Sequence, residues 1–360
     1  MNINEIINLR LINQSISNTL SSGVKEIVTQ MCAVQAQDFN MAEWAVGVRL
    51  NGSNIKTIET GLNNAEILRT HVLRPTWHLV TANDIYWMLE LTSPRIKSSL
   101  KSRHRDLEVT KNVINKSKKI FEKALGADHH LTREELVNKL NKSNIQTNNN
   151  RASHIFLSAE LDGLICSGII KGKKQTYALL EERVASKRIL YKDEALAELA
   201  GRYFKSRGPA TLEDFVWWSG LSVRESRNAL EMIRNDFVSV KIDSRTFWFK
   251  DTSDTKKNMD NKIYLLPAYD EFLISYKDRS AVIPDEYFSK TVSNNGIFRP
   301  VIIYNGKVIG IWKRVRKKDK VLIEAVLFKS PTNSTKKMIK KASLMLGDFL
   351  RDEVEVTFIN

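Results

Sequence analysis

The order of secondary-structure signals repeats in the middle of the chain, and this repeat most limits the folds available to it. Thr132 is followed three residues later by Glu135, and Thr211 by Asp214, about 80 residues further on. A side-chain acceptor with an acidic residue three positions later is a capping box, which begins a helix. A further predicted helix and then two predicted strands follow each box. This is the element order of a winged helix, so tandem winged-helix modules are predicted.

The hairpin of the first of these modules has a basic turn. Residues 165–170 and 175–179 predict two strands on either side of Lys171, Gly172, Lys173 and Lys174. In the second module, residues 238–242 and 246–249 flank a turn, and Ser222 with Glu225 forms another capping box. Lysines at the tip of a winged-helix hairpin are placed to contact DNA phosphates.

The N-terminal and C-terminal regions predict further elements. Residues 24–31 and 41–50 have helical spacing, and residues 67–80 alternate like two strands around Arg74–Pro75. A mostly polar stretch at 251–261 reads as a linker. Beyond it, strands are predicted at 263–266, 301–304, 307–312, 321–328 and 354–359, with a helix at 334–349. This C-terminal region is expected to be a small barrel or sheet.

The charge balance favours a polyanionic partner. The 360 residues include 56 Lys and Arg against 41 Asp and Glu, a net charge of +15. Residues 101–123 hold eight basic side chains against three acidic ones, and residues 307–320 hold seven against one. The second segment includes Lys313, Arg314 and Arg316. Such side chains bind phosphates without reading sequence, although a solvated charged face is the alternative for each segment.

Several protein classes receive no support from the sequence. Cys32 and Cys166 are 134 positions apart, so there is no Cys-x-x-Cys pair for a zinc ribbon, and both are expected to be buried apolar residues. Glycine-rich nucleotide loops and the usual metalloprotease and hydrolase motifs are absent from the sequence. No metal and no cofactor is expected. No apolar run approaches the ~20 residues of a membrane span, so a soluble cytoplasmic protein is expected.

The segment Val34-Gln35-Ala36-Gln37-Asp38 carries the first candidate site. In an extended segment Gln35 and Gln37 lie on one side of the chain, whereas on a helix they point about 200° apart. Extended geometry is favoured because the preceding helix is expected to end here. Two carboxamides can hold one water molecule in a fixed orientation, but neither takes up a proton near neutral pH. They can therefore serve only a reaction with a good leaving group. The structural alternative is two glutamines at an exposed helix end.

Two further segments contain candidate site residues. On the predicted hairpin, Arg69 and His71 share one face and His78 lies on the other strand, with Arg74 at the turn. An arginine and two histidines suit a phosphate or a DNA groove, but a half-buried hairpin whose histidines bind backbone groups is equally consistent. The other segment runs from Leu266 to Arg279. Its charged residues favour an ion-pair network over a catalytic carboxylate; they are Asp270, Glu271, Lys277, Asp278 and Arg279.

Taken in order, these three segments resemble the bacterial winged helix DNA-binding domain family, which includes the AlkZ-like and YcaQ-like DNA glycosylases. The resemblance covers nearly the whole chain. It implies an α+β fold of three tandem winged helices and a C-terminal β-barrel. The domains are then expected at residues 1–124, 125–188, 189–258 and 259–360. The signature Gln-x-Gln falls on Gln35 and Gln37, which makes the chain AlkZ-like, since Asp38 lies one residue too late for the Gln-x-Asp signature of YcaQ-like members.

The resemblance also implies a reaction. Family members excise alkylated purines, including bulky adducts and crosslinks attached through guanine N7. This agrees with the amide argument, because an N7-alkylated guanine is cationic and already a good leaving group. Gln35 and Gln37 are expected to orient the attacking water. The hairpin residues would contact DNA, and Asp38, Asp270, Glu271, Asp278 and Arg279 would support the site. No feature marks a Schiff-base lysine, so a monofunctional enzyme is expected.

Two alternatives to an enzyme remain open at the level of sequence. A winged-helix protein can bind DNA without chemistry, as a regulator does, and would then bind intact duplex without releasing a base. A protein-interaction module is disfavoured by the basic segments. The expected partner is double-stranded DNA with alkylation damage, the expected state is a monomer associated with the nucleoid, and no membrane partner is expected.

Overall fold

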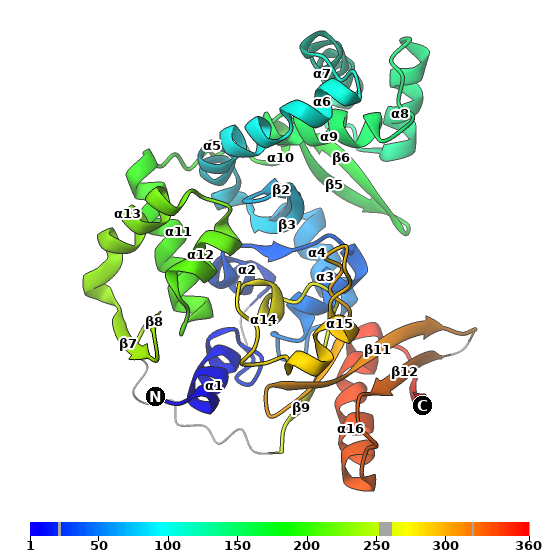
Figure 1. The fold of residues 1–360 in the computed structure, drawn as a ribbon. Coiled ribbons are helices and arrows are strands. Elements are labelled where there is room, and N and C mark those ends of the chain that lie inside the picture. The colour runs from blue at the N-terminus through cyan, green and yellow to red at the C-terminus, as the bar shows by residue number, and fades with distance from the viewer. Residues whose placement is uncertain (21–22, 252–260, 319, 360) are drawn as a thin grey trace. The chain divides into compact units, whose positions relative to one another are not determined.

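The computed structural model describes residues 1–20, 23–251, 261–318 and 320–359 (Figure 1). The chain forms two compact units, which are described separately. Unit 1 contains Met1–Ile58, Ala197–Trp218 and Ser222–Asn360, and unit 2 contains Glu59–Leu196 and Ser219–Leu221. Unit 2 thus joins residues from the first two predicted modules with a few from the third. Most of the predicted linker, residues 252–260, and with it the predicted boundary at 258/259, lies outside the described residues.

Unit 2, all of whose residues are described, is a mixed α/β structure built on two hairpins. Its elements are β2 (Ile67–Val72), β3 (Thr76–Thr81), α5 (Ala82–Ser99), α6 (Lys101–Asp106), α7 (Lys111–Leu125), β4 (Leu131–Thr132), α8 (Arg133–Lys142), α9 (Arg151–Leu161), β5 (Ile165–Lys171), β6 (Lys174–Leu179) and α10 (Leu180–Arg183). The short strand β4 extends the second hairpin into a sheet of order β4-β6-β5. Both predicted hairpins are confirmed.

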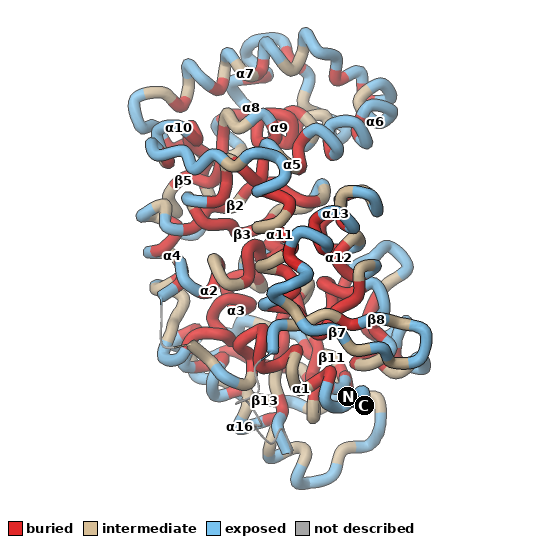
Figure 2. Tube along the Cα trace, turned by 90° about the vertical axis from the view of Figure 1, so that its left-hand side faces the viewer, coloured by how far each residue is buried: buried red, intermediate tan, exposed pale blue. Residues whose placement is uncertain are grey.

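The hydrophobic core of unit 2 packs helices α7 and α9 against strand β6. Phe121 on α7, Phe156 on α9 and Tyr177 on β6 form a buried aromatic row, with ring centroids 4.9 and 4.8 Å apart. The predicted capping box at Thr132 begins α8, because its hydroxyl accepts from the Glu135 N–H while the Glu135 carboxylate accepts from the Thr132 N–H. By contrast α6, which carries part of the basic segment 101–123, has no buried residue (Figure 2).

Unit 1 brings together three separate stretches of the chain. The N-terminal elements are α1 (Ile3–Asn13), α2 (Val24–Met31), β1 (Val34–Gln35), α3 (Phe39–Gly47) and the start of α4 (Ile55–Asn63). The middle stretch supplies most of α11 (Lys192–Arg207) and α12 (Leu212–Ser219). The predicted capping box at Thr211 is confirmed, since Thr211 and Asp214 exchange backbone-to-side-chain hydrogen bonds of 3.0 and 3.2 Å.

The third stretch of unit 1 is the longest. Its elements are α13 (Val223–Ile233), the 3-10 turn η1 (Arg234–Asp236), β7 (Val238–Ile242), β8 (Arg245–Phe249), β9 (Ile263–Leu266), α14 (Glu271–Ile274), η2 (Asp285–Tyr287), α15 (Phe288–Thr291), β10 (Val301–Tyr304), β11 (Lys307–Arg316), β12 (Val321–Leu327), α16 (Asn333–Leu350) and β13 (Val354–Ile359). The Ser222 box begins α13 as predicted.

The C-terminal strands form an open sheet, so the predicted β-barrel is not confirmed. The order is β13-β12-β11-β10-β9, antiparallel except for the β12–β13 pair, and no pairing of β9 with β13 is found in the part that the structure describes. The physical reason is α16. This helix connects β12 to its parallel neighbour β13 and contacts both edge strands, β9 and β13, so it covers one face of the sheet. A two-layer arrangement therefore replaces a closed barrel.

Close packing joins α16 to the N-terminal part of unit 1. The ring of Phe349 packs against Trp44 of α3, with centroids 5.2 Å apart. The Trp44 indole N–H in turn donates to the carbonyl of Leu265 on β9, at 2.8 Å. This packing buries α3, which carries the candidate segment at its N-terminal end (Figure 2).

Two further findings bear on the expectations from composition. Cys32 and Cys166 are both buried, which confirms their prediction as apolar core residues. Among the described helices, none has the length and apolar character that a membrane span requires.

Candidate functional site

The two candidate glutamines lie on an extended segment between two helices of unit 1. Helix α2 ends at Met31, Gln35 ends the short strand β1, and α3 begins at Phe39. The segment is therefore not helical, as predicted, with Gln35 extended in β1 and Gln37 at a bend. Gln35 is buried, whereas Gln37 is exposed. Asp38 caps α3 by accepting from the Met41 N–H at 3.2 Å, so the segment leads directly into the helix.

A buried carboxylate from α14 holds the backbone of Gln35. The backbone N–H of Gln35 donates to Oε1 of this carboxylate, Glu271, at 2.8 Å. The second oxygen, Oε2, accepts from Arg207 Nη2 at 2.8 Å, the Ser275 hydroxyl at 2.6 Å and the Trp218 indole N–H at 3.0 Å. The side chains of Glu271 and Arg207 are both fully buried. Because each oxygen has close donors, this carboxylate is well satisfied despite its burial.

Arg207 holds the same segment from the other side of the ion pair. Its Nη1 donates to the Met31 carbonyl at 2.7 Å, and its Nη2 to the Ala33 carbonyl at 2.8 Å. Burial alone would raise the pKa of Glu271. The opposing effects of Arg207, the Ser275 hydroxyl and the Gln35 N–H are larger and lower the pKa to about 2. The carboxylate is thus ionised at neutral pH. Together the two charged side chains bind three backbone groups within residues 31–35.

A second buried ion pair lies beside the first. Asp270 accepts from Nη1 and Nη2 of Arg49, both at 2.9 Å, and it also caps α14 through the Phe272 N–H. The bidentate geometry and full burial of the pair resemble those of a structural anchor. The interpretation of this region as an ion-pair network is confirmed for Asp270 and Glu271. Their partners, Arg49 and Arg207, lie far away in the sequence.

The remaining charged residues of this region have separate roles. Asp278 forms an exposed ion pair with Arg245. Lys277 is also exposed. Arg279 is buried, and its guanidinium lies 5.1 Å from the Trp217 ring and 4.9 Å from the Phe298 ring. These contacts place Arg279 among aromatic side chains rather than beside Gln35.

In unit 2, the first hairpin places its four candidate residues in different surroundings. His71 is buried against the carboxylate of Glu160, and His78 is buried with Nδ1 at 2.9 Å from the Thr76 carbonyl. The alternative of a histidine bound to a backbone group therefore holds for His78. Arg69 is half-buried, with its guanidinium 4.4 Å from the Trp77 ring, and Arg74 is half-buried at the turn.

The basic candidates on the other strands differ in their exposure and partners. On the β5–β6 hairpin, Lys171 donates to the His130 carbonyl, Lys173 is exposed, and Lys174 pairs with Glu134 at 2.7 Å. Those on β11 are Lys313, which is exposed, Arg314, which is half-buried, and Arg316, which pairs with Asp352 at 2.7 Å. Within the described residues, no cluster of His, Cys, Asp and Glu is arranged to hold a metal ion.

Arg207, Arg49 and Ser275 are the supporting residues that the sequence did not reveal. Arg207 ends α11 without any motif, and Arg49 follows α3 in an otherwise apolar stretch. A fully buried arginine requires an acidic partner, but the sequence does not show which arginines are buried. Only the assembled unit brings each one to its carboxylate.

Comparison with known proteins places the chain among the DNA glycosylases, which are hydrolases of N-glycosyl bonds. The matching family model, described as DNA glycosylase AlkZ-like, covers residues 28–349. The chain belongs to this family, which confirms the resemblance and does not favour the alternative of a non-catalytic DNA-binding protein.

Two comparisons, one of sequence and one of structure, both match AlkZ of Streptomyces sahachiroi over most of its length. The interstrand DNA cross-link repair glycosylase of Streptomyces sahachiroi is 24% identical over 324 residues, 85% of this chain and 86% of that protein. The solved structure of the Streptomyces sahachiroi DNA glycosylase AlkZ superposes with a TM-score of 0.82 at 20% identity, and the match covers 100% of both chains. At this identity the second match shows a shared fold.

Proposed function

We propose that the protein is a monofunctional DNA glycosylase that hydrolyses the N-glycosidic bond of alkylated purines, with N7-alkylguanine as its substrate class. The supporting observation is the segment that carries Gln35 and Gln37. Its backbone is held extended by the buried Glu271–Arg207 pair. A loop fixed by an ion pair that is itself fully buried is suited to holding side chains in one geometry.

The chemistry follows from what an amide can and cannot do. Alkylation at N7 makes the guanine cationic, so the bond between C1′ and N9 breaks without protonation of the base by the enzyme. The electron pair of that bond goes to the base, and C1′ gains oxocarbenium character. Gln35 and Gln37 would accept the hydrogens of one water molecule and direct its oxygen at C1′. The water supplies the hydroxyl of the abasic sugar and loses its second proton to solvent.

The residues proposed to take part in DNA binding, directly or indirectly, come from both units. They are Arg69, His71, Arg74, His78, Lys171, Lys173 and Lys174 in unit 2, and Lys313, Arg314 and Arg316 in unit 1. In the proposal Glu271 supports the catalytic segment directly and through Arg207, and Asp270 supports it by capping α14. Asp38, Asp278 and Arg279 are proposed to support neighbouring loops. The burial of His71 and His78 favours an indirect role for these two residues, through the shape of the hairpin.

The modular organisation and the biological role are also proposals. We infer three winged helices, at residues 1–124, 125–188 and 189–258, because two hairpins of unit 2 and the β7–β8 hairpin each follow helices. By analogy with the Streptomyces relative that is named for cross-link repair, the substrate class includes crosslinked DNA. A monomer that acts on DNA in the nucleoid fits this role.

The first prediction tests the two glutamines. Replacement of both, Gln35→Ala with Gln37→Ala, is expected to lower the rate of N7-methylguanine release about 100-fold or more, because the water loses its orientation. Release is measured from a methylated duplex under single-turnover conditions. DNA affinity, measured in parallel, should stay within about twofold, because neither side chain carries charge.

Asn40→Ala provides the matched control. Asn40 is an exposed carboxamide in the first turn of α3, three residues beyond Gln37. This variant should release the base at the wild-type rate. Release at the wild-type rate by the double glutamine variant would remove the two glutamines from the mechanism, even though the protein remains a member of the glycosylase family.

A further inference from the structure

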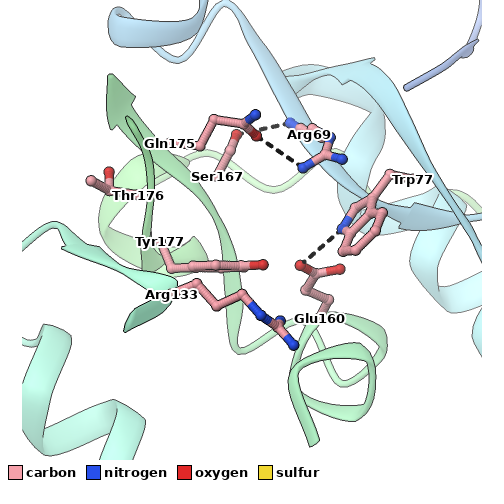
Figure 3. A pocket seen from close by; sticks show the side chains of 8 residues that line it. All are labelled: Arg69, Trp77, Arg133, Glu160, Ser167, Gln175, Thr176 and Tyr177. Carbon is pink, nitrogen blue, oxygen red and sulfur yellow. Dashed lines mark hydrogen bonds between the residues drawn. The ribbon is translucent and has the colours of Figure 1, made fainter. Parts of the chain in front are cut away.

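A polar pocket in unit 2 has neither Gln35 nor Gln37 in its lining and takes no part in the proposed hydrolysis. Its volume is about 220 Å³, and side chains from both hairpins and from α8 and α9 line it (Figure 3). Ligand sites for drug-sized molecules usually have volumes of about 300–1,000 Å³, so this pocket suits a smaller ligand. In Figure 3 the side chains surround an open centre, with Arg69 and Gln175 facing Arg133 and Glu160 across it.

The acceptor in this pocket is a buried carboxylate. Glu160 is 1% exposed, and its Oε2 contacts Nδ1 of His71. Its other oxygen, Oε1, lies 3.4 Å from the Trp77 indole nitrogen, which is long for a hydrogen bond. A carboxylate oxygen has two lone pairs, so Oε1 keeps the capacity to accept hydrogen bonds from a ligand.

The donors in the pocket are two arginines held by aromatic rings. The Arg69 guanidinium lies 4.4 Å from the Trp77 ring and donates to Gln175 Oε1 at 2.9 Å. The Arg133 guanidinium lies 4.6 Å from the Phe156 ring and donates from Nη2 to Ser153 at 3.0 Å. Its Nη1 is buried and has no hydrogen-bond partner among the described residues. A buried guanidinium nitrogen without an acceptor is unfavourable, so an acceptor on a ligand would stabilise it.

The aromatic side chains complete the wall of the pocket. The rings of Trp77 and Tyr177 border the open centre, and the Tyr177 phenol points toward the Glu160 carboxylate (Figure 3). Burial and the Glu160 charge raise the pKa of Tyr177, which keeps the phenol protonated. A ligand here therefore meets flat apolar surface, the N–H donors of Arg69 on one side, and Arg133 together with the Glu160 carboxylate on the other (Figure 3). A phosphate would meet the carboxylate unfavourably.

We propose that this pocket binds an unpaired guanine base. Guanine offers the acceptors O6 and N7 to an arginine, while its N2 amino group and N1–H are neighbouring donors for a carboxylate. Adenine, cytosine and thymine do not combine two adjacent donors with two adjacent acceptors. Aromatic stacking accounts for general base affinity, and the Arg133–Glu160 combination for the choice of guanine. The proposal rests on DNA as the family's substrate and does not depend on Gln35 or Gln37.

The test measures binding of the four deoxynucleoside monophosphates to the full-length protein by calorimetry. Binding of dGMP is expected to be at least about tenfold tighter than that of dAMP, dCMP or dTMP, because only guanine uses both charged partners. Arg133→Met and Glu160→Gln should each weaken dGMP binding about tenfold and leave dAMP binding unchanged. Arg133 is only half-buried, so Arg133→Met is expected to fold and keeps the test informative if Glu160→Gln does not.

Arg95→Met is the matched control, because it removes an exposed arginine of the same unit on α5, outside the pocket lining. It should bind dGMP like the wild type. Binding of a duplex with one bulged guanine, compared with one bulged adenine, then shows whether the guanine comes from DNA or from a free nucleotide. A guanine preference that Arg133→Met abolishes supports a base from DNA, and a preference confined to dGMP supports a free nucleotide.

Two results would overturn the proposal. One is equal binding of all four nucleotides, and the other is equal dGMP binding by Arg133→Met and Arg95→Met. The double glutamine variant separates this proposal from the proposed reaction. It should bind dGMP like the wild type whether or not it still releases N7-methylguanine.

Discussion

At the scale of single residues, the buried charges of Glu271 and Arg207 in unit 1 bind backbone groups. Glu271 receives one backbone N–H, from Gln35, and Arg207 donates to two backbone carbonyls. The sequence predicted the two glutamines and an ion-pair network around Glu271. It could not predict Arg207 as the partner, because nothing local distinguishes a buried arginine from an exposed one. The pairing is a property of tertiary structure.

The pH dependence of stability provides a prediction at this scale. Glu271 has its pKa lowered to about 2, from an ordinary value near 4.5. It therefore stabilises the folded state fully above about pH 4.5, and this contribution decreases as the pH falls toward 2. By linkage it amounts to about 3 kcal/mol at neutral pH. Glu271→Gln should lower the free energy of unfolding by about 3–5 kcal/mol at pH 7, because Arg207 loses its counter-charge.

Urea unfolding at pH 7 and pH 3 checks this prediction. The difference in unfolding free energy between wild type and Glu271→Gln should be smaller at pH 3 than at pH 7. Glu213→Gln, an exposed change on α12, should show little difference at either pH. A difference for Glu271→Gln that is the same at both pH values would contradict the lowered pKa.

At the scale of elements, local sequence patterns predicted most helices and strands. They did not predict how strands distant in the sequence pair with one another. The Thr132, Thr211 and Ser222 boxes each begin a helix, because capping depends only on residues three apart. The strand order of the C-terminal sheet depends instead on which strands, distant in the sequence, pair along their edges. Nothing in the 334–349 pattern showed that this helix would cover the sheet and leave it open. The α6–α7 region was noticed only for its charge.

The contact between α3 and α16 yields the prediction for this scale. A Cβ atom added at Gly47 would overlap the ring of Phe349. Gly47→Ala should therefore lower the free energy of unfolding by about 1–3 kcal/mol, despite the better helix propensity of alanine. Thermal unfolding of Gly47→Ala, Phe349→Leu and the double variant measures the coupling. The double variant should lose less stability than the sum of the single losses, and simple additivity would show that the two helices do not meet there.

At the scale of the whole molecule, the net charge of +15 is spread over exposed strands and helices of both units. It favours binding to any DNA, whereas the two neutral glutamines are proposed to act on one bond. The basic segments are evident from the sequence, but the sequence could not show which of their side chains pair with acidic neighbours. Lys174 and Arg316, for example, have close acidic partners.

Salt dependence provides the prediction for the whole molecule. The logarithm of DNA affinity should fall linearly with the logarithm of salt concentration, because bound phosphates release counterions. Lys313→Gln with Arg314→Gln should reduce the magnitude of this slope by up to about 2 and weaken intact and methylated duplex equally. Anisotropy titrations at several salt concentrations measure it. Lys25→Gln with Lys56→Gln, exposed charges elsewhere in unit 1, should leave the slope unchanged, and an equal effect of both pairs would argue against a specific role for β11.

The support of Gln35 by Glu271 also determines when this segment takes its shape during synthesis. The two residues are 236 positions apart, so the ribosome makes the glutamines long before their partner. At about 5–20 residues per second, the delay is roughly 10–50 s. The hydrogen bond from Gln35 to Glu271 therefore forms late, although its donor is made early. An N-terminal fragment that ends before Arg207 lacks both of these charged anchors.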